Sequence, residues 1–261
     1  DMSSTAVPSI KPSLFADDDG PPRRQKWHYR SVIGMLNYLE KTTRPDLAFA
    51  VHQAARFSIN PKLSHERAIH RIVKYLVGTK DKGLLFRPNK SLGIVCHVDA
   101  DFAGLWNKID AEKPTSVLSR TGYVIQYCGC QLVWMSKLQT EVALSTTEAE
   151  YIALSQAMRE LIPLIGLLSE IAPMFGVVQA PPNMKCTLFE DNDGCLQLAR
   201  APRMNPRTKY IWLKYHHFRS YVQNKLVQIE PIDTTEQLAD MLTKPLEAPQ
   251  FTKLRKGLLG W

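Results

Sequence analysis

The sequence lacks a long hydrophobic run, and its cysteines form no CxxC pair. The longest strongly apolar run, residues 161–168, is far too short to cross a bilayer and contains Pro163 and Gly166. A disulfide framework or a zinc site is not expected, and most of the five cysteines lie in apolar, strand-like stretches. We therefore expect reduced, buried, structural cysteines and no interaction with a membrane.

The start of the chain has no basic segment followed by an apolar one, so the sequence shows no secretory signal. Its first residue is Asp1 rather than Met, which indicates a fragment of a longer protein or a processed product. The chain has 261 residues, 44% hydrophobic and 22% charged, which is typical of a globular protein with one or two domains. The 33 basic against 25 acidic residues give a net charge of +8, which permits binding to nucleic acid.

The pattern of apolar residues changes twice along the chain. Residues 1–26 are rich in Ser, Pro and Asp and predict a linker or tail. Residues 27–86 show apolar side chains at helical spacing, which predicts a small helical module. From residue 87 to residue 261 strand-like and helical stretches alternate, which predicts an α/β domain.

The α/β domain is expected to contain five strands and several helices. The strand-like stretches are residues 92–98, 122–129, 130–136, 183–190 and 226–232, with Gly129 in a tight turn. A long helix is expected from about Thr147, with a kink or restart at Pro163. An amphipathic helix is expected around residues 211–222. A short final helix over 234–245 would begin with a capping box of Thr234 and Gln237.

Acidic residues recur where these elements begin or end. Asp99 and Asp101 end the first strand, Glu148 and Glu150 lie on the long helix, and Asp191 follows the fourth strand. A further acid, Asp240, lies on the last helix. Carboxylates that converge in one pocket repel one another unless cations lie between them, and Mg²⁺ or Mn²⁺ prefers oxygen ligands. The residues alone leave two interpretations open, a metal site or ordinary solvated acids.

At these residues the sequence resembles a known family. The motifs are D-A-D-F-A-G, S-T-T-E-A-E-Y-I-A-L, E-D-N and Q-L-A-D-M-L-T-K-P-L. They are similar, in this order, to the ribonuclease H domain of copia-type (Pseudoviridae) retrotransposon Pol polyproteins. Upstream, T-R-P-D-L-A-F-A-V and K-Y-L-V-G-T-K-D-K-G-L resemble the connection segment between polymerase and ribonuclease H. The likeness runs from about residue 29 to the end.

The resemblance implies a ribonuclease H-like fold, a mixed five-stranded sheet with flanking helices. It also implies a catalytic site in which Asp99, Glu150, Asp191 and Asp240 hold two Mg²⁺ ions, with Mn²⁺ as an alternative. Glu148 and Glu150 lie about 200° apart around a helix, so only one of them points inward. Asp101 is expected to be an outer acid or a turn residue, with direct ligation as the alternative. Glu190 and Asp193 are expected to be solvated.

Two groups of residues are candidates for binding nucleic acid. Ser145 and Thr146, before the helix of Glu150, and Asn192 are placed to contact the backbone or a sugar. A basic segment interleaved with aromatic residues contributes Arg203, Arg207, Lys209 and Lys214. Basic side chains contact phosphates, and a hybrid is recognised by its shape and its 2′-hydroxyls. The alternative for the basic segment is a solvated surface.

The leading hypothesis is a ribonuclease H, an endonuclease that hydrolyses the RNA strand of RNA–DNA hybrids within a retrotransposon reverse transcriptase. The expected partners are the hybrid and the polymerase domain of the same polyprotein, which this chain does not contain. The expected location is a cytoplasmic virus-like particle or the nucleus. The alternatives are a degenerate or domesticated module that binds nucleic acid without catalysis and, less favoured, an integrase-like nuclease.

Overall fold

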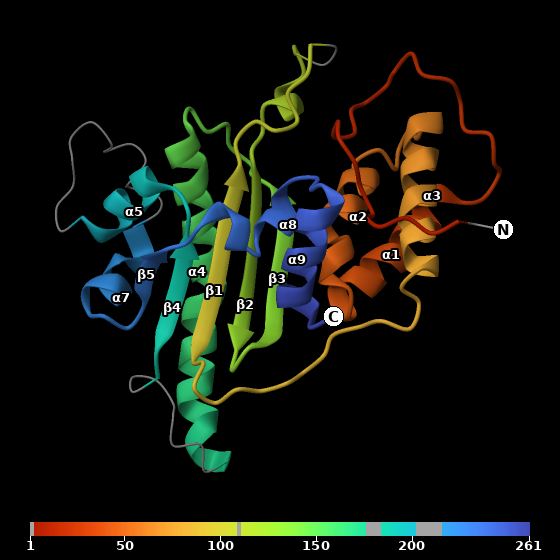
Figure 1. The fold of residues 1–261 in the computed structure, drawn as a ribbon. Helices are drawn as coiled ribbons and strands as arrows, with labels where there is room; N and C mark the ends of the chain where they lie inside the picture. The colour runs from red at the N-terminus through yellow and green to blue at the C-terminus, as the bar shows by residue number, and fades with distance from the viewer. Residues whose placement is uncertain (1–2, 109–110, 176–183, 202–215) are drawn as a thin grey trace.

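The computed structural model describes residues 3–108, 111–175, 184–201 and 216–261 (Figure 1). Five strands form one sheet in the order β3-β2-β1-β4-β5. Strands β1, β2 and β3 pair antiparallel, whereas β1 with β4 and β4 with β5 pair parallel. The strands are β1 (Ile94–Asp101), β2 (Arg120–Tyr127), β3 (Cys130–Leu138), β4 (Cys186–Glu190) and β5 (Gln228–Pro231). The predicted mixed five-stranded sheet with flanking helices, the architecture expected of a ribonuclease H-like fold, is confirmed.

Cys128 and Gly129 form the tight turn between β2 and β3. Their φ angles are 52° and 78°, the left-handed conformations that a two-residue hairpin requires. The turn predicted at Gly129 is therefore present. The described cysteines are free, and four of the five are buried, as expected.

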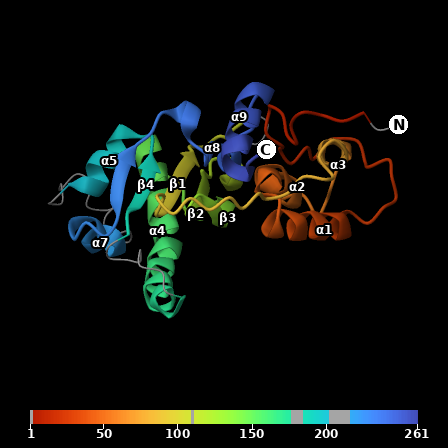
Figure 2. The same cartoon turned by 60° about the horizontal axis from the view of Figure 1, so that its bottom comes forward.

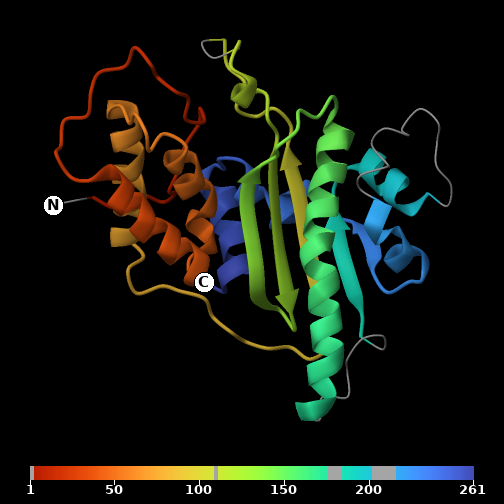
Figure 3. The same cartoon turned by 180° about the vertical axis from the view of Figure 1, so that it is seen from behind.

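Helix α4 (Thr146–Ile171) covers one face of the sheet (Figure 3). Its alanines, Met158, Leu161 and Ile165 pack on alternate residues of β1 and β4 in one apolar core. The predicted restart at Pro163 is wrong, because α4 is one continuous helix, whereas the predicted kink stays a prediction. Pro163 lies on the exposed face, so the missing N–H affects the solvent side while Leu161 and Ile165 hold the helix on the sheet.

Residues Thr146–Phe175 are long and apolar enough to cross a membrane by length and composition, with a mean hydropathy of 1.3. Half of the 18-residue window that meets this hydropathy is buried inside the protein. The apolar composition of α4 thus has a local explanation, since a helix that packs lengthwise on a sheet needs a broad apolar face.

The edge of the sheet near β5 carries two shorter helices, α5 (Asp193–Arg200) and α7 (Arg219–Gln223). A 3₁₀ turn at His216–Phe218 precedes α7, and Phe218 is buried in the core beneath α4. The first part of the amphipathic helix predicted around 211–222 lies outside the described residues.

The opposite face of the sheet is covered by elements that follow β5 (Figure 2). The single final helix predicted over 234–245 is instead a 3₁₀ turn at Thr234–Glu236 and a one-turn helix α8 (Asp240–Thr243). The sequence analysis missed the helix α9 (Ala248–Leu259). Its signal was the helical spacing of Phe251, Leu254 and Leu258, all of which are buried.

The N-terminal module contains α1 (Tyr29–Thr42), a 3₁₀ turn (Pro45–Leu47), α2 (Ala48–Ala55) and α3 (Leu63–Val77). It packs on α9 and on the outer face of β2 and β3, in a second apolar cluster. The indole N–H of Trp134 on β3 donates to the carbonyl of Glu40 on α1 at 2.9 Å. The module and the sheet therefore share a core, while the boundaries placed after residues 26 and 86 stay predictions.

A buried ion pair joins the module to α9. Arg44 donates to both carboxylate oxygens of Asp46, at 3.0 and 2.8 Å, and the Tyr75 hydroxyl donates to Asp46 at 2.6 Å. Arg255 of α9 donates to the Tyr75 hydroxyl at 3.2 Å. Each buried charge thus has a partner, as burial requires, and this accounts physically for the R-P-D segment at residues 44–46.

Gly122 on β2 leaves the space in which α8 approaches the sheet. It lies opposite Asp99 in the β1–β2 ladder. A Cβ atom added here would lie 2.6 Å from Thr243 Cγ2, 2.9 Å from Leu242 Cβ and 3.0 Å from the Ala239 carbonyl oxygen. The one-turn helix α8 can therefore lie close to Asp99 because residue 122 has no side chain.

We expect Gly122→Ala to lower the free energy of unfolding by about 1–3 kcal/mol, the usual cost of overpacking. Gly34→Ala is the control, because Gly34 lies exposed in α1 and an added Cβ meets nothing within 4 Å. That control should be neutral or stabilising by up to about 1 kcal/mol. Urea unfolding of the three proteins makes the comparison, and equal stability of Gly122→Ala and wild type would contradict the packing described here.

Candidate active site

Asp99 lies near the carboxyl end of β1 and is only 2% exposed. Side chains alternate along a strand, so Val98 and Ala100 face α4 while Asp99 faces α8. The hydroxyl of Thr243, the last residue of α8, donates to Asp99 Oδ2. The aspartate at the strand end is thus turned inward and hydrogen-bonded, while its role as a metal ligand stays a prediction.

Three of the predicted acids meet at this edge of the sheet. One carboxylate oxygen each from Asp99, Glu150 and Asp191 lies within 4.8 Å of the other two. Glu150 comes from the first turns of α4 and accepts a hydrogen bond from the backbone of Ala100. Asp191, directly after β4, is half-buried and accepts from the Thr234 hydroxyl at 2.8 Å.

The choice of Glu150 over Glu148 agrees with the structure. Glu150 is buried, whereas Glu148 points back and accepts from the backbone N–H of Leu144 at 2.8 Å. The two side chains leave α4 in different directions, as helical geometry requires.

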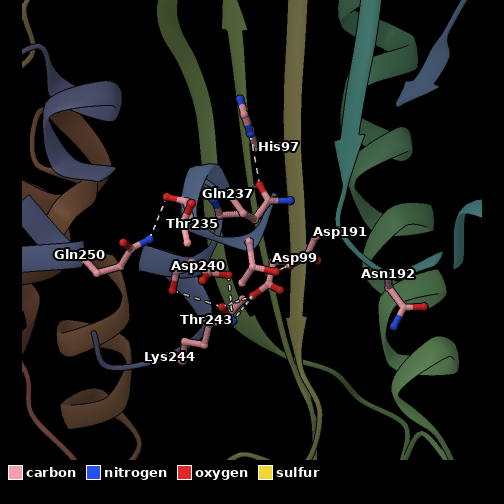
Figure 4. Close-up of polar contacts among 12 residues, drawn as sticks. His97, Asp99, Asp191, Asn192, Thr235, Gln237, Asp240, Thr243, Lys244 and Gln250 are labelled. Carbon is pink, nitrogen blue, oxygen red and sulfur yellow. Dashed lines mark hydrogen bonds and ion pairs between the residues drawn. The ribbon is translucent and has the colours of Figure 1, made fainter. Parts of the chain in front are cut away.

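Asp240, the fourth predicted acid, lies beside Asp99 on α8 and outside the group of three oxygens. The charge of Asp99 raises the pKa of Asp240, so the two carboxyl groups are close in space. Figure 4 shows Asp99 between Asp240 on one side and Asp191 on the other. Glu150 completes the group of three oxygens with Asp99 and Asp191.

The sequence analysis missed Lys244. Its Nζ atom lies 2.9 Å from Asp240 Oδ1 and 3.9 Å from Asp99 Oδ2. The signal was the spacing of four residues from Asp240, but Lys244 with Pro245 was interpreted as a helix end. Figure 4 shows the Lys244 side chain turned toward the two aspartates.

Gln237 was also missed, because Thr234 and Gln237 were predicted to form a capping box. That prediction is wrong, since the Asp233 side chain caps this turn by accepting from Thr235 N–H. Gln237 is fully buried, and its amide donates to the carbonyls of Val98 at 2.8 Å and Phe189 at 3.4 Å. It thus links the segment that carries Asp240 to both strands that carry the other aspartates.

His97 completes this link. Its ring lies 3.2 Å from the Gln237 side-chain oxygen, which accepts the hydrogen bond because the amide nitrogen already donates. Burial lowers the pKa of His97 to about 4, so the ring is neutral at pH 7. His97 acts here as an uncharged hydrogen-bonding group.

Burial dominates the electrostatics of the acids. Removal from water raises the pKa of Asp99, and Lys244 opposes that shift. Burial and then the charge of Glu190 raise the pKa of Glu150. Burial and then the charge of Asp99 raise the pKa of Asp240 to about 7. Each carboxyl thus holds its proton more tightly than in water unless a cation is near.

The expectation that Glu190 is solvated is wrong. Glu190 is fully buried on the α4 side of β4, and its Oε1 accepts from the Asn192 N–H at 3.1 Å. Because strand residues alternate, Glu190 faces the core while Asp191 reaches the edge. Asp193 is exposed, as expected. Asp101 is half-buried and outside the group of three oxygens, and its role stays a prediction.

The candidates for nucleic-acid binding lie beside the acids where the structure describes them. Ser145 and Thr146 are exposed at the start of α4, and Ser145 accepts from the Glu148 N–H. Asn192 caps α5 by accepting from the Cys195 N–H at 2.9 Å. Arg203, Arg207, Lys209 and Lys214 lie outside the described residues. Binding by any of these residues stays a prediction.

Proteins similar in sequence to this chain include Pol polyproteins of retrotransposons. The chain is 33% identical over 250 residues to the "Retrovirus-related Pol polyprotein from transposon RE1" of Arabidopsis thaliana, which is 96% of the chain and 16% of that relative. It is 38% identical over 232 residues to the corresponding protein from transposon TNT 1-94 of Nicotiana tabacum, which is 89% of the chain and 16% of that relative. The chain belongs to the family of copia-type Pol polyproteins.

This Pol segment thus spans 16% of the length of the relatives it matches. No protein-family model matches it. Among solved structures it is similar to LC11-RNase H1, isolated from compost, at 19% identity and a TM-score of 0.39. That likeness covers 58% of the Pol segment and 92% of the solved chain.

The acids of the Pol segment fit a hard divalent cation. All three grouped ligands are carboxylate oxygens, the donors that Mg²⁺ and Mn²⁺ prefer. Glu150 Oε2 is buried and has no hydrogen-bond partner among the described residues. A buried, unpaired carboxylate oxygen is costly without a cation, so the residues present favour one.

The raised pKa of Asp240 predicts a pH dependence of stability. The folded chain binds this proton more tightly than the unfolded chain does, so the stabilisation is complete below the ordinary pKa of 3.8 and is lost as the pH rises through about 7. Asp240→Asn avoids this loss. In EDTA, the melting temperature of Asp240→Asn relative to wild type should therefore be higher at about pH 8.5 than at about pH 5.

The exposed Asp81 provides a control of the same chemistry, since Asp81→Asn should differ from wild type by a similar amount at both pH values. If the advantage of Asp240→Asn stayed constant or shrank with rising pH, the burial of an ionising Asp240 carboxyl would be refuted.

Proposed function

We propose that this chain is the ribonuclease H of a copia-type reverse transcriptase, an endonuclease that hydrolyses the RNA strand of RNA–DNA hybrids. The observation that carries the proposal is the meeting of Asp99, Glu150 and Asp191 oxygens within 4.8 Å at the carboxyl ends of β1 and β4. Membership of the Pol family and the ribonuclease H-like sheet support it.

Asp99, Glu150, Asp191 and Asp240 are the residues that would hold two Mg²⁺ or Mn²⁺ ions. When bound, such ions supply a nucleophilic water and neutralise the charge on the leaving oxygen of a phosphodiester. The protein's own part is to fix the carboxylates before the substrate arrives. Thr243 orients Asp99, and Gln237 holds the α8 segment against β1 and β4.

The proposal needs no nucleophilic side chain. Cys195 and Cys96 are buried, and burial raises the pKa of both thiols, which keeps them protonated. His97 is neutral and bound to Gln237. Water activation by carboxylate-bound ions is therefore the chemistry that this set of residues supports best.

The hybrid would lie across the starts of α4 and α5. Ser145, Thr146 and Asn192 would contact its backbone or sugars, and the basic segment of Arg203, Arg207, Lys209 and Lys214 would bind phosphates. The Thr147 hydroxyl lies 3.4 Å from Asn192 Oδ1, so these two helix starts are neighbours. Both are adjacent to Glu150 and Asp191, which supports this placement.

The expected partners are the hybrid and the polymerase domain of the same polyprotein. We propose that the chain works within a virus-like particle in the cytoplasm or in the nucleus. The segment from 27 to 86 would be the connection that joins the ribonuclease H domain, 87–261, to the polymerase.

We expect Asp99→Asn and Asp191→Asn to lose hybrid cleavage by at least about a hundredfold, since even outer partners of metal ligands can contribute that much. Binding of a labelled hybrid should survive in Ca²⁺, because these changes remove no positive charge. Cleavage of a labelled hybrid in Mg²⁺, followed on a denaturing gel, measures the loss. Asp193→Asn is the matched control, exposed and two residues from Asp191, and should cleave like wild type.

A fully active Asp191→Asn would contradict the proposal. A wild-type chain that binds the hybrid but cleaves it in neither Mg²⁺ nor Mn²⁺ would favour the alternative, a module that binds nucleic acid without catalysis.

A further inference from the structure

We propose that the ammonium group of Lys244 occupies the place between Asp99 and Asp240 in the acidic site. A second divalent ion can bind in that place only by displacing the ammonium group. The inference deepens the proposed function and rests on it, because it concerns ion binding by the same acids. It assigns a positioning role to a residue outside the set of carboxylates.

Lys244 contacts both aspartates. Its Nζ atom is 2.9 Å from Asp240 Oδ1 and 3.9 Å from Asp99 Oδ2 (Figure 4). An ammonium group is a compact point charge with three donors, so it can serve two carboxylates at once. In this position it offsets the repulsion between the two carboxylates that it contacts.

The electrostatics agree with these contacts. Burial alone would lower the pKa of Lys244, but the charges of Asp99 and Asp240 outweigh it and raise the pKa. Lys244 in turn works against the raised pKa values of both aspartates. The two carboxylates therefore favour the charged form of Lys244, and Lys244 offsets part of the effect of burial on both carboxyl groups.

The two candidate ion positions, one on Asp99, Glu150 and Asp191 and the other between Asp99 and Asp240, differ in the positive charge near them. Among the residues that the structure describes, no lysine or arginine forms an ion pair with Glu150 or Asp191. An ion on Asp99, Glu150 and Asp191 would have Lys244 beside only one of its three ligands, Asp99, at 3.9 Å. An ion between Asp99 and Asp240 would meet Lys244, since like charges cannot share that place.

The Lys244 side chain can also move away from the two aspartates. Its side chain is 32% exposed, whereas those of Asp99 and Asp240 are 3% and 4% exposed. Its backbone is extended and precedes Pro245, which favours that conformation. The ammonium can therefore swing into water by side-chain rotation while the carboxylates and the main chain stay in place.

The test counts Mn²⁺ ions bound to the 261-residue chain by isothermal titration calorimetry. Wild type should bind one ion well and a second ion weakly. Lys244→Met should bind the second ion at least about tenfold more tightly, in the range by which partners of metal ligands tune affinity. Lys244→Arg keeps the charge and should keep the weak second site.

Lys253→Gln is the matched control. Lys253 forms an ion pair with Glu236 on the surface of the same C-terminal region, so the variant removes one positive charge away from the acids. Its second ion should bind as in wild type. Equal affinities for the second ion in wild type and Lys244→Met would overturn the inference.

A second measurement uses wild type alone and so does not depend on the folding of a variant. An amine-acylating reagent, read by peptide mass spectrometry, should modify Lys244 slowly until Mn²⁺ fills the second site and then several times faster. Lys253 should react at one rate throughout. A Lys244 rate that does not rise with Mn²⁺ would contradict displacement.

The two proposals fail differently. A chain that shows these binding changes but cleaves no hybrid would refute the proposed function and leave the role of Lys244 standing. A chain that cleaves hybrid, while Lys244→Met and wild type bind ions identically, would refute only the role of Lys244.

Discussion

The fold buries several acidic side chains at the carboxyl ends of β1 and β4, where their charges repel one another. The surrounding structure is arranged to offset that repulsion. Asp99, Glu150, Glu190 and Asp240 are buried, and Asp191 borders them. Like charges in a medium of low polarity must be neutralised, hydrogen-bonded or protonated. The structure uses a hydroxyl from Thr243, backbone N–H groups from Ala100 and Asn192, and the ammonium of Lys244.

That constraint explains why so short a segment as α8 matters. It brings Asp240, Thr243 and Lys244 against β1, and it fits only because Gly122 has no side chain. Gln237 binds it to the two strands that carry the aspartates. A one-turn helix has little stability of its own, so its place is fixed by these contacts and by the packing of its own apolar residues, Met241 and Leu242.

The helical module contributes to the same arrangement from a distance. Its buried residues share one cluster with Met241, Leu242 and the apolar face of α9. The Arg44–Asp46 pair, Tyr75 and Arg255 hold α9 to the module. In this Pol segment the N-terminal helical module thus packs behind the segment that carries Asp240 and supports the site through these contacts.

The sequence by itself determined the features that depend on local spacing. Period-two and period-3.6 patterns located the five strands and α4, and the 200° separation on a helix allowed only one of Glu148 and Glu150 to point inward. Motif order identified the family and the acids. The strands, the helix and the directions of its side chains follow from the geometry of the main chain between neighbouring residues. They can therefore be predicted without knowing the fold.

Only the tertiary structure decided the rest. Lys244 and Gln237 look like residues of a helix end and a cap until the chain brings them against β1. Glu190 looks solvated beside Asp191 until α4 covers its face of β4, and Pro163 interrupts nothing because it faces water while α4 packs on the sheet. Which charges meet, and what stands between them, depends on contacts across more than 100 residues, such as that of Thr243 with Asp99.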